Sequence, residues 1–258
     1  MPQFVVVTGA STGIGHACAD YLIKNGFRVF AGVRKTADAE RLRDELGEGV
    51  IPLIMDVTDA ATLNDAAKTV SEALAGSTLA GLVCNAGVAV FGPMLGADAA
   101  YTGKPGRIVM MSSVAGKMGA PFMGPYSASK HALEGLTKSL RKEVALYGIE
   151  CVIIGPGAVA TPIWDKAEEI DVEQYKDTDY VKPMTNVLNW MRKRGPEGLK
   201  PEQIAARVHH AITADKPDLR YAEVPDRLTN WTIPRLLPER LVDKITIKRI
   251  GLRPEDRE

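Results

Sequence analysis

The stretch that decides the fold is FVVVTGASTGIG, residues 4–15. It opens with an apolar run rich in Val, which is too short for a helix and typical of a buried strand. Gly9, Gly13 and Gly15 follow where the chain would turn into a helix. Glycine adopts positive φ at little cost and lets a ligand approach the backbone, and the start of a helix offers free N–H groups and a partial positive charge. A glycine-rich turn alone also serves as a plain connection, but directly after the first strand it favours binding of a dinucleotide pyrophosphate.

Outward from this stretch, short β-branched runs alternate with longer stretches of helical periodicity. Such alternation indicates a parallel sheet with helices on both faces, which right-handed crossovers make doubly wound. We therefore expect a single Rossmann-like α/β domain over residues 1–258, in which ligands bind at the carboxyl ends of the strands. The expected strands are Phe4–Thr8, Arg28–Val33, Val50–Met55, Leu79–Cys84, Arg107–Met111 and Glu150–Ile154, and the expected helices are Gly13–Asn25, Ala37–Leu46, Ala60–Leu74 and Tyr126–Tyr147.

The last third of the chain has a different pattern, with aromatic residues among many charges. Trp164, Met184 and Trp190 are expected either to line a lipophilic substrate pocket or to form a core of their own. Residues 234–250 mix apolar with basic residues and are expected to form a C-terminal helix that packs on the domain or on a partner subunit. Membrane-surface binding is the less favoured alternative for that helix. The other expected elements are a helical insertion over residues 164–200 at the carboxyl edge of the sheet, a helix over residues 201–214 and an edge strand over residues 219–224.

Composition excludes several classes of protein. Apolar residues make up 45% of the 258 residues and charged residues 25%, the balance of a soluble globular protein. Lys and Arg together number 32, as do Asp and Glu, which argues against a nucleic-acid binder that relies on bulk positive charge. The three cysteines form no CxxC pair and the four histidines have no ligand spacing, so we expect neither a disulfide framework nor a metal site. No charged segment precedes an apolar run at the start of the chain, and we expect a cytoplasmic protein without a signal peptide.

The loops after the second, third and fourth strands carry polar residues that suit a dinucleotide. After the second strand, Arg34 and Lys35 stand where an acidic residue would bind the ribose 2′-hydroxyl of NAD(H). Two cations suit a 2′-phosphate instead, so we expect NADP(H) rather than NAD(H); the alternative is a solvated approach to the next helix. Asp56-Val57 is expected to meet the adenine amino group. Asn85-Ala86-Gly87 places a polar side chain at the end of the fourth strand, where it can tie neighbouring strands together.

The sharpest constellation is Ser113, Tyr126 and Lys130. Tyr126 and Lys130 are four residues apart at the start of an expected helix, so their side chains share a face. A phenol has an ordinary pKa of about 10 and keeps its proton near neutral pH, but a nearby ammonium group and the N-terminus of a helix both favour the phenolate. Ser113 ends the fifth strand and is expected to bind a substrate oxygen. Together these groups suit proton exchange with an alcohol or carbonyl oxygen while a nicotinamide exchanges a hydride.

These motifs resemble those of the short-chain dehydrogenases/reductases over residues 3–163. The matching motifs are residues 8–15, Asn85-Ala86-Gly87, Ser112-Ser113, residues 126–130 (YSASK) and Pro156-Gly157. The resemblance implies that Tyr126 is the acid/base, that Lys130 holds the nicotinamide ribose and favours ionisation of the tyrosine, that Ser113 rather than Ser112 orients the substrate, and that Thr161 touches the carboxamide. It implies NADP-linked members that act on retinoids, steroids or other lipophilic alcohols and ketones. The sequence does not fix the oligomeric state, for which a homodimer and a homotetramer are the candidates. The cofactor-binding residues expected in total are Gly9, Ser11, Thr12, Gly13, Ile14, Gly15, Arg34, Lys35, Asp56, Val57, Asn85, Ala86, Gly87, Tyr126, Lys130, Pro156, Gly157, Val159 and Thr161.

One segment departs from the family pattern. The stretch from Asn85 to Ser113 is much shorter than is usual in the family, and no Asn occurs between Asn85 and Tyr126 to serve as the family's fourth catalytic residue. Several Gly and Pro residues in 88–106 leave room for only a short helix near residues 94–101. A natural deletion, an engineered or spliced form and an incomplete sequence are competing explanations.

We expect an oxidoreductase that transfers a hydride between NADP(H) and an alcohol/ketone or aldehyde of a small lipophilic molecule. The alternative, motivated by the short segment, is a catalytically impaired NADP(H)-binding sensor or regulatory protein. An isomerase or dehydratase that uses the same tyrosine is a third interpretation and would consume no NADPH.

Overall fold

The computed structural model describes residues 3–75, 79–85, 106–167 and 170–256. Within these residues a seven-stranded sheet has the order β3-β2-β1-β4-β5-β6-β7, and the pairings from β3 through β6 are parallel. The strand order reverses between β1 and β4, the point at which sheets of this kind hold ligands. The strands are β1 Gln3–Thr8, β2 Phe27–Val33, β3 Val50–Ile54, β4 Leu79–Cys84, β5 Arg107–Met111, β6 Glu150–Pro156 and β7 Arg220–Glu223.

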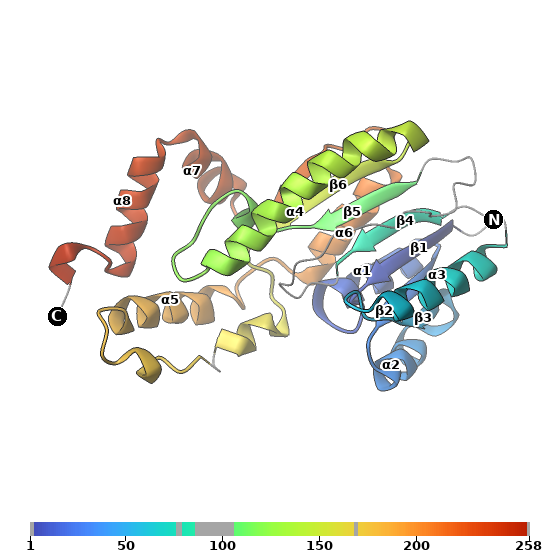
Figure 1. Ribbon diagram of the computed structural model, residues 1–258, viewed down its shortest axis with the longest axis horizontal. Helices are drawn as coiled ribbons and strands as arrows, with labels where there is room; N and C mark the ends of the chain where they lie inside the picture. Colours follow the sequence, from blue (N-terminus) through green and yellow to red (C-terminus); the bar gives the residue numbers. More distant parts are fainter. Residues whose placement is uncertain (1–2, 76–78, 86–105, 168–169, 257–258) are drawn as a thin grey trace. The chain divides into compact units, whose positions relative to one another are not determined.

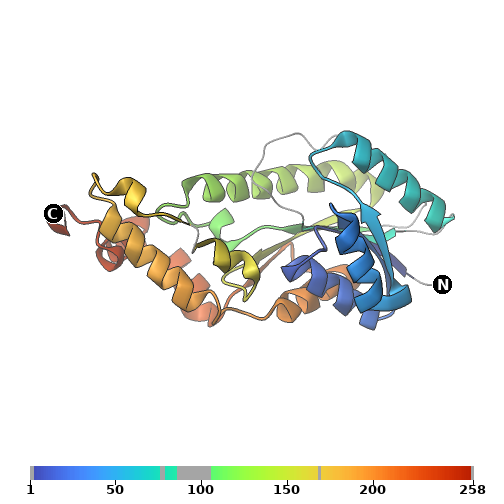
Figure 2. The ribbon, with the colours of Figure 1, turned by 90° about the horizontal axis from the view of Figure 1, so that it is seen from below.

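Helices cover both faces of this sheet, as expected for a doubly wound fold. Figures 1 and 2 show α3 and α4 on one face and α1 and α6 on the other, where α1 packs against α6. The helices are α1 Gly13–Lys24, α2 Thr36–Leu46, α3 Ala60–Leu74, α4 Gly124–Glu143, α5 Val181–Arg194, α6 Pro201–Thr213, α7 Ile233–Leu236 and α8 Glu239–Ile250.

Helix α3 illustrates how the pattern of residues produces an element. Asp59 caps its start, because the carboxylate accepts a hydrogen bond of 2.9 Å from the backbone N–H of Ala61. Residues spaced three and four apart along the helix then face the sheet, where they pack against alternate residues of β1 and neighbouring strands. This cluster contains Leu63, Ala66, Val70 and Leu74 from α3 and Phe4, Val6, Phe30, Leu53 and Met55 from the sheet and its edge.

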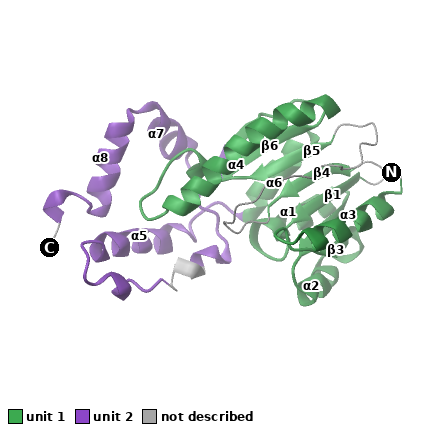
Figure 3. Ribbon diagram, viewed as in Figure 1, with its two compact units in different colours: residues 1–155, 201–221 green, residues 156–200, 222–258 purple. Residues whose placement is uncertain are grey.

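The chain divides into two compact units, shown in Figure 3: residues 1–155 with 201–221, and residues 156–200 with 222–258. The first holds nearly all of the sheet and its helices, and the second holds α5, α7 and α8. In the second unit, the indole Nε1 of Trp164 donates to the carbonyl of Val159 at 2.6 Å. The Trp164 ring lies so close to Gly195 that a side chain at that position would collide with it. Trp164 therefore packs inside its own unit, whereas Trp190 is exposed.

The expected single C-terminal helix over residues 234–250 is wrong, because the chain forms two helices there. Leu237 is extended, with φ −75° and ψ 149°, and α8 starts only after Pro238. A proline disfavours helical geometry in the residue before it and lacks an N–H to donate. The expected helix over residues 126–147 also differs: α4 begins at Gly124, and its last turn, Val144–Tyr147, is a 3-10 helix.

The helical insertion expected over residues 164–200 is only partly helical, because it consists of α5 and the short 3-10 turns Pro162–Ala167 and Glu173–Tyr175. The remaining expected strands and helices lie within two residues of the observed ones. The short helix expected near residues 94–101 and the motif residues Ala86 and Gly87 lie outside the described residues. Among the residues that the structure describes, no helix combines the length and apolar character that crossing a membrane requires.

The packing of α1 generates a stability prediction. Leu22 is fully buried, whereas Leu146 is 83% exposed. The Leu22→Ala change should lower the free energy of unfolding by about 2–5 kcal/mol, because it leaves a cavity in a packed core. Leu146→Ala should change it by less than about 0.5 kcal/mol. Urea denaturation of both variants measures the difference, and equal effects would contradict the described core.

Candidate active site

The glycine-rich turn between β1 and α1 has the geometry that its sequence predicts. Gly9 and Gly13 have φ values of +65° and +60°. A side chain on Gly15 would collide with the carbonyl of Gly9 and the amide of Asn85, so the turn and the end of β4 meet closely. Thr12 precedes α1 but makes no side-chain capping bond, and the first turn of α1 holds no acidic residue. The N–H groups and partial positive charge of this helix start therefore suit an anionic ligand such as a pyrophosphate.

Asn85 ties the end of β4 to the turn after β1. Its Nδ2 donates to the carbonyls of Thr8 and Gly9 at 3.1 and 3.0 Å, and its backbone N–H donates to Oγ1 of Thr8 at 3.0 Å. Thr8 in turn donates to the carbonyl of Val83 at 3.3 Å. This is the strand-tying role that we expected for Asn85, and it holds the glycine-rich turn at the point where the strand order reverses.

The loop after β2 presents positive charge. Arg34 and Lys35 are both exposed, directly before α2. The nearby Asp56 accepts hydrogen bonds of 2.9 and 2.7 Å from the backbone N–H and the hydroxyl of Thr58. These bonds lower the pKa of Asp56, and the charge of Arg34 adds to that effect.

A cation that the sequence analysis missed also contacts the turn. Nη2 of Arg41 donates to the carbonyl of Ser11 at 2.5 Å and forms an ion pair with Asp38 at 3.2 Å. Glu45 lies at 3.2 Å from the same guanidinium group and at 2.9 Å from His16. Arg41 thus links α2 to the glycine-rich turn, and no motif in the sequence marks it.

Ser113 lies two residues after the end of β5, where it caps a 3-10 turn over Val114–Gly116. Its Oγ accepts a hydrogen bond of 3.1 Å from the backbone N–H of Ala115. The neighbouring Ser112 instead donates from its buried hydroxyl to Oε1 of Glu134 at 3.1 Å. Ser112 is therefore engaged inside the fold, and the role of Ser113 toward a substrate stays a prediction.

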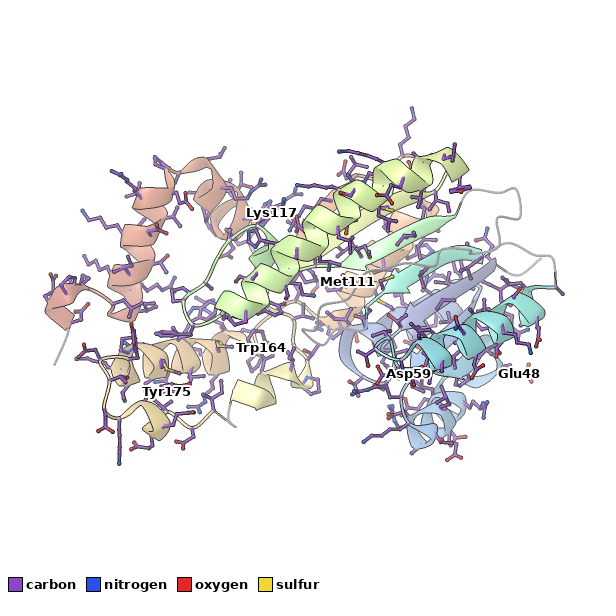
Figure 4. The ribbon with its side chains drawn as sticks, in the orientation of Figure 1. Glu48, Asp59, Met111, Lys117, Trp164 and Tyr175 are labelled. Atoms are coloured by element: carbon purple, nitrogen blue, oxygen red, sulfur yellow. The ribbon has the colours of Figure 1, made fainter. Side chains whose placement is uncertain are left out.

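Tyr126 and Lys130 lie in the first turns of α4, which begins at Gly124 with Pro125 at its first turn. Nζ of Lys130 lies 5.8 Å from the centre of the Tyr126 ring and donates to the carbonyl of Met111 at 3.0 Å. Burial lowers the pKa of Lys130, because a low-dielectric environment disfavours the ammonium form. Helix α4 also packs against the 3-10 turn that Ser113 caps, so the elements that carry the three predicted residues are neighbours. Figure 4 labels Met111 at the end of β5 and Lys117 in the segment that follows it.

Behind this group lies a buried carboxylate that the sequence analysis also missed. Glu134 contacts Lys117 and Arg220 as well as Ser112, and Arg220 reaches the carbonyl of Ser113. Glu134 follows Lys130 by four residues on the same face of α4, and this spacing is the one signal that sequence reasoning had for it.

The loop after β6 carries the remaining predicted residues, and it belongs to the second unit. The backbone N–H of Gly157 donates to the carbonyl of Glu223 at 2.8 Å. Val159 is buried and forms a bridge with Leu199. These contacts hold the backbone that leads to Thr161.

Known proteins resemble this chain over most of its length. A family model described as short chain dehydrogenase matches residues 3–102 and 94–171. The NADPH-dependent 3-dehydrocapnine reductase of Ornithobacterium rhinotracheale is 34% identical, over 95% of this chain and 96% of its own length. Human retinol dehydrogenase 5 is 29% identical, over 94% of this chain and 87% of its own. Among solved structures, a variant of actinorhodin polyketide ketoreductase with NADPH has a TM-score of 0.66 and 28% identity, over 89% of this chain and 98% of the other.

The comparisons bear on the short segment as well. The alignment with the Ornithobacterium reductase runs over 277 positions, more than the 258 residues of this chain, so the relative has residues that this chain lacks. The family model matches in two pieces that overlap at residues 94–102. That junction falls inside the segment that the sequence analysis identifies as short.

The doubly wound sheet, the glycine-rich turn at its reversal point and the extent of these matches lead to one conclusion: the chain belongs to the short-chain dehydrogenases, a family of oxidoreductases.

Proposed function

We propose that this protein is an NADP(H)-dependent oxidoreductase that interconverts an alcohol and a ketone or aldehyde on a small lipophilic molecule, with Tyr126 as the acid/base. The observation that carries the proposal is the position of Lys130. Its partly buried ammonium group lies beside the Tyr126 ring and is hydrogen-bonded to the end of β5, two residues before Ser113. A cation held there favours the phenolate of Tyr126 when a proton moves.

Each residue then has one task. Tyr126 gives a proton to the carbonyl oxygen during reduction, or takes it from the alcohol during oxidation. Ser113 orients that oxygen by a hydrogen bond, which places it within reach of the phenol. Lys130 keeps positive charge beside the oxygen on which negative charge develops.

The cofactor that suits this chain is NADP(H), which supplies or accepts the hydride at its nicotinamide ring when bound. The glycine-rich turn and the start of α1 suit the pyrophosphate, and Arg34 and Lys35 suit the 2′-phosphate. The Ornithobacterium reductase is NADPH-dependent and the actinorhodin ketoreductase structure holds NADPH, which supports the same cofactor for this chain. The similarity to human retinol dehydrogenase 5 supports a lipophilic substrate.

The proposed role of Tyr126 generates a direct test. Tyr126→Phe should lower kcat/KM by at least about 100-fold, because general acid–base catalysis contributes about 10²–10⁴-fold. NADPH affinity should stay within about twofold, as measured by quenching of protein fluorescence. Tyr147→Phe, at an exposed tyrosine after the far end of α4, is the matched control and should keep full activity. Full activity of Tyr126→Phe would overturn the mechanism.

The proposed role of Arg34 generates a second test. Arg34→Asp should lower the ratio of kcat/KM with NADPH to that with NADH by about 10- to 100-fold, because a hydrogen bond to a charged group contributes about 1.5–3 kcal/mol. Arg43→Asp removes an exposed cation further along α2 and controls for general charge. An unchanged ratio for Arg34→Asp would show that Arg34 is only a solvated residue before the helix.

A further inference from the structure

We propose that Glu134 and Arg220 are positioning residues that fix the position of Ser113 relative to Tyr126 and Lys130. This inference rests on the proposed function and deepens it, because it names the groups that set the geometry of the acid/base site. Four residues form what we call the Glu134 cluster: Glu134, Arg220, Lys117 and Ser112.

The cluster converges on one carboxylate from three parts of the fold. Glu134 comes from α4, and its side chain is only 2% exposed. Nε and Nη2 of Arg220, at the start of β7, donate to Oε1 of Glu134 at 3.0 and 2.9 Å. Nζ of Lys117 forms an ion pair with Oε2 at 2.9 Å, and the hydroxyl of Ser112 donates to Oε1 at 3.1 Å. Two cations and a hydroxyl group thereby compensate the charge and the hydrogen-bonding needs of the buried carboxylate.

Arg220 connects this carboxylate to the site itself. Its Nη2 donates to the carbonyl of Ser113 at 3.1 Å as well as to Glu134. The planar guanidinium group presents several donors in fixed directions. The Arg220 side chain can therefore fix the position of the Ser113 backbone relative to α4. A lysine in its place would keep the charge but has no such rigid fork.

The end of β5 is consequently held at three successive residues. The carbonyl of Met111 accepts from Lys130, the hydroxyl of Ser112 donates to Glu134, and the carbonyl of Ser113 accepts from Arg220. Lys130 and Glu134 lie one turn apart on the helix that also carries Tyr126. The segment with the substrate-orienting hydroxyl is therefore fixed to the helix with the acid/base, and a misplacement of about 1 Å in such a site is enough to cost about 100-fold in rate.

Two glycines make room for the cluster. A side chain on Gly116 would place its Cβ 2.6 Å from Oγ of Ser112 and 2.7 Å from Oε1 of Glu134. A side chain on Gly155 would collide with the guanidinium group of Arg220. The backbone around the cluster thus has space for these contacts and for little else.

The titration of Glu134 agrees with this arrangement. Burial alone would raise the pKa of Glu134, but the hydrogen bonds and charges of Arg220 and Lys117 outweigh burial and lower it. The carboxylate therefore stays ionised at neutral pH, and the cluster is complete under assay conditions. A folded-state pKa below the ordinary value stabilises the fold at neutral pH, and that contribution is lost as the pH falls through the lowered value.

A double-mutant cycle between Arg220 and Ser113 tests the proposal. Arg220→Lys should lower kcat by about 10- to 100-fold while the Kd for NADPH changes by less than about twofold. In a Ser113→Ala background the same change should lower kcat by less than about threefold, because the group that Arg220 positions is already absent. A purely structural role would give the same fold loss in both backgrounds, and that result would overturn the proposal.

The matched control is Arg141→Lys. Arg141 also joins α4 to other elements, since its Nε and Nη2 donate to the carbonyls of Cys151 and Leu219 at 2.9 and 3.1 Å, but no described contact reaches residues 111–113. The Arg141→Lys change should lower the midpoint temperature of thermal unfolding and leave kcat unchanged. If Arg220→Lys does not fold, the same cycle is run with Ser112→Ala in its place. Ser112→Ala should lower kcat threefold to tenfold when Ser113 is present, and by less when Ser113 is replaced by Ala. An unchanged kcat for Ser112→Ala would overturn the proposal.

The cycle also separates this proposal from the function on which it rests. If wild-type protein turns over, Ser113→Ala is impaired and Arg220→Lys is fully active, the positioning role is wrong and the proposed function stands. If folded wild-type protein shows no turnover with any substrate of the lipophilic ketone and aldehyde panel, the proposed function fails, and the positioning role fails with it.

Discussion

The hydrogen bond from Nζ of Lys130 to the carbonyl of Met111 is the contact on which the proposed chemistry depends. It joins the first turns of α4 to the end of β5, and so joins the helix of Tyr126 to the strand that leads into Ser113. The same ammonium group lies beside the Tyr126 ring. One partly buried cation thus links the two elements and supplies the charge that an acid/base tyrosine needs.

Burying a cation is costly unless nearby groups compensate for the lost hydration. A backbone carbonyl gives part of that compensation to Lys130. One turn further along α4, Glu134 is compensated by Arg220, Lys117 and Ser112. Breaking a buried ion pair on one side leaves an unpaired charge, which is more harmful than the loss of the contact itself. Strong coupling among these groups is therefore expected, and single substitutions report on the whole cluster.

The order of strands and helices was predictable from the sequence because apolar periodicity changes between two and about 3.6 at each boundary. Gly9, Gly13 and Asn85 were predictable because their roles are local or follow from strand order. Pro238 is a signal for a helix break, but the apolar residues on both sides of it favour a continuous helix over residues 234–250. The structure shows the break. Arg220 had no sequence signal, because its contact with Ser113 joins residues 107 positions apart and only the edge position of β7 brings them together.

The central claim is that the chain catalyses NADPH-dependent reduction through Tyr126, and initial-rate measurement of NADPH oxidation tests it most directly. Purified protein would be assayed against a panel of lipophilic ketones and aldehydes, with NADH in parallel. The account predicts turnover with NADPH well above that with NADH. Protein that is folded and binds NADPH, but oxidises it with no member of the panel, would contradict the account and favour a non-catalytic nucleotide-binding protein.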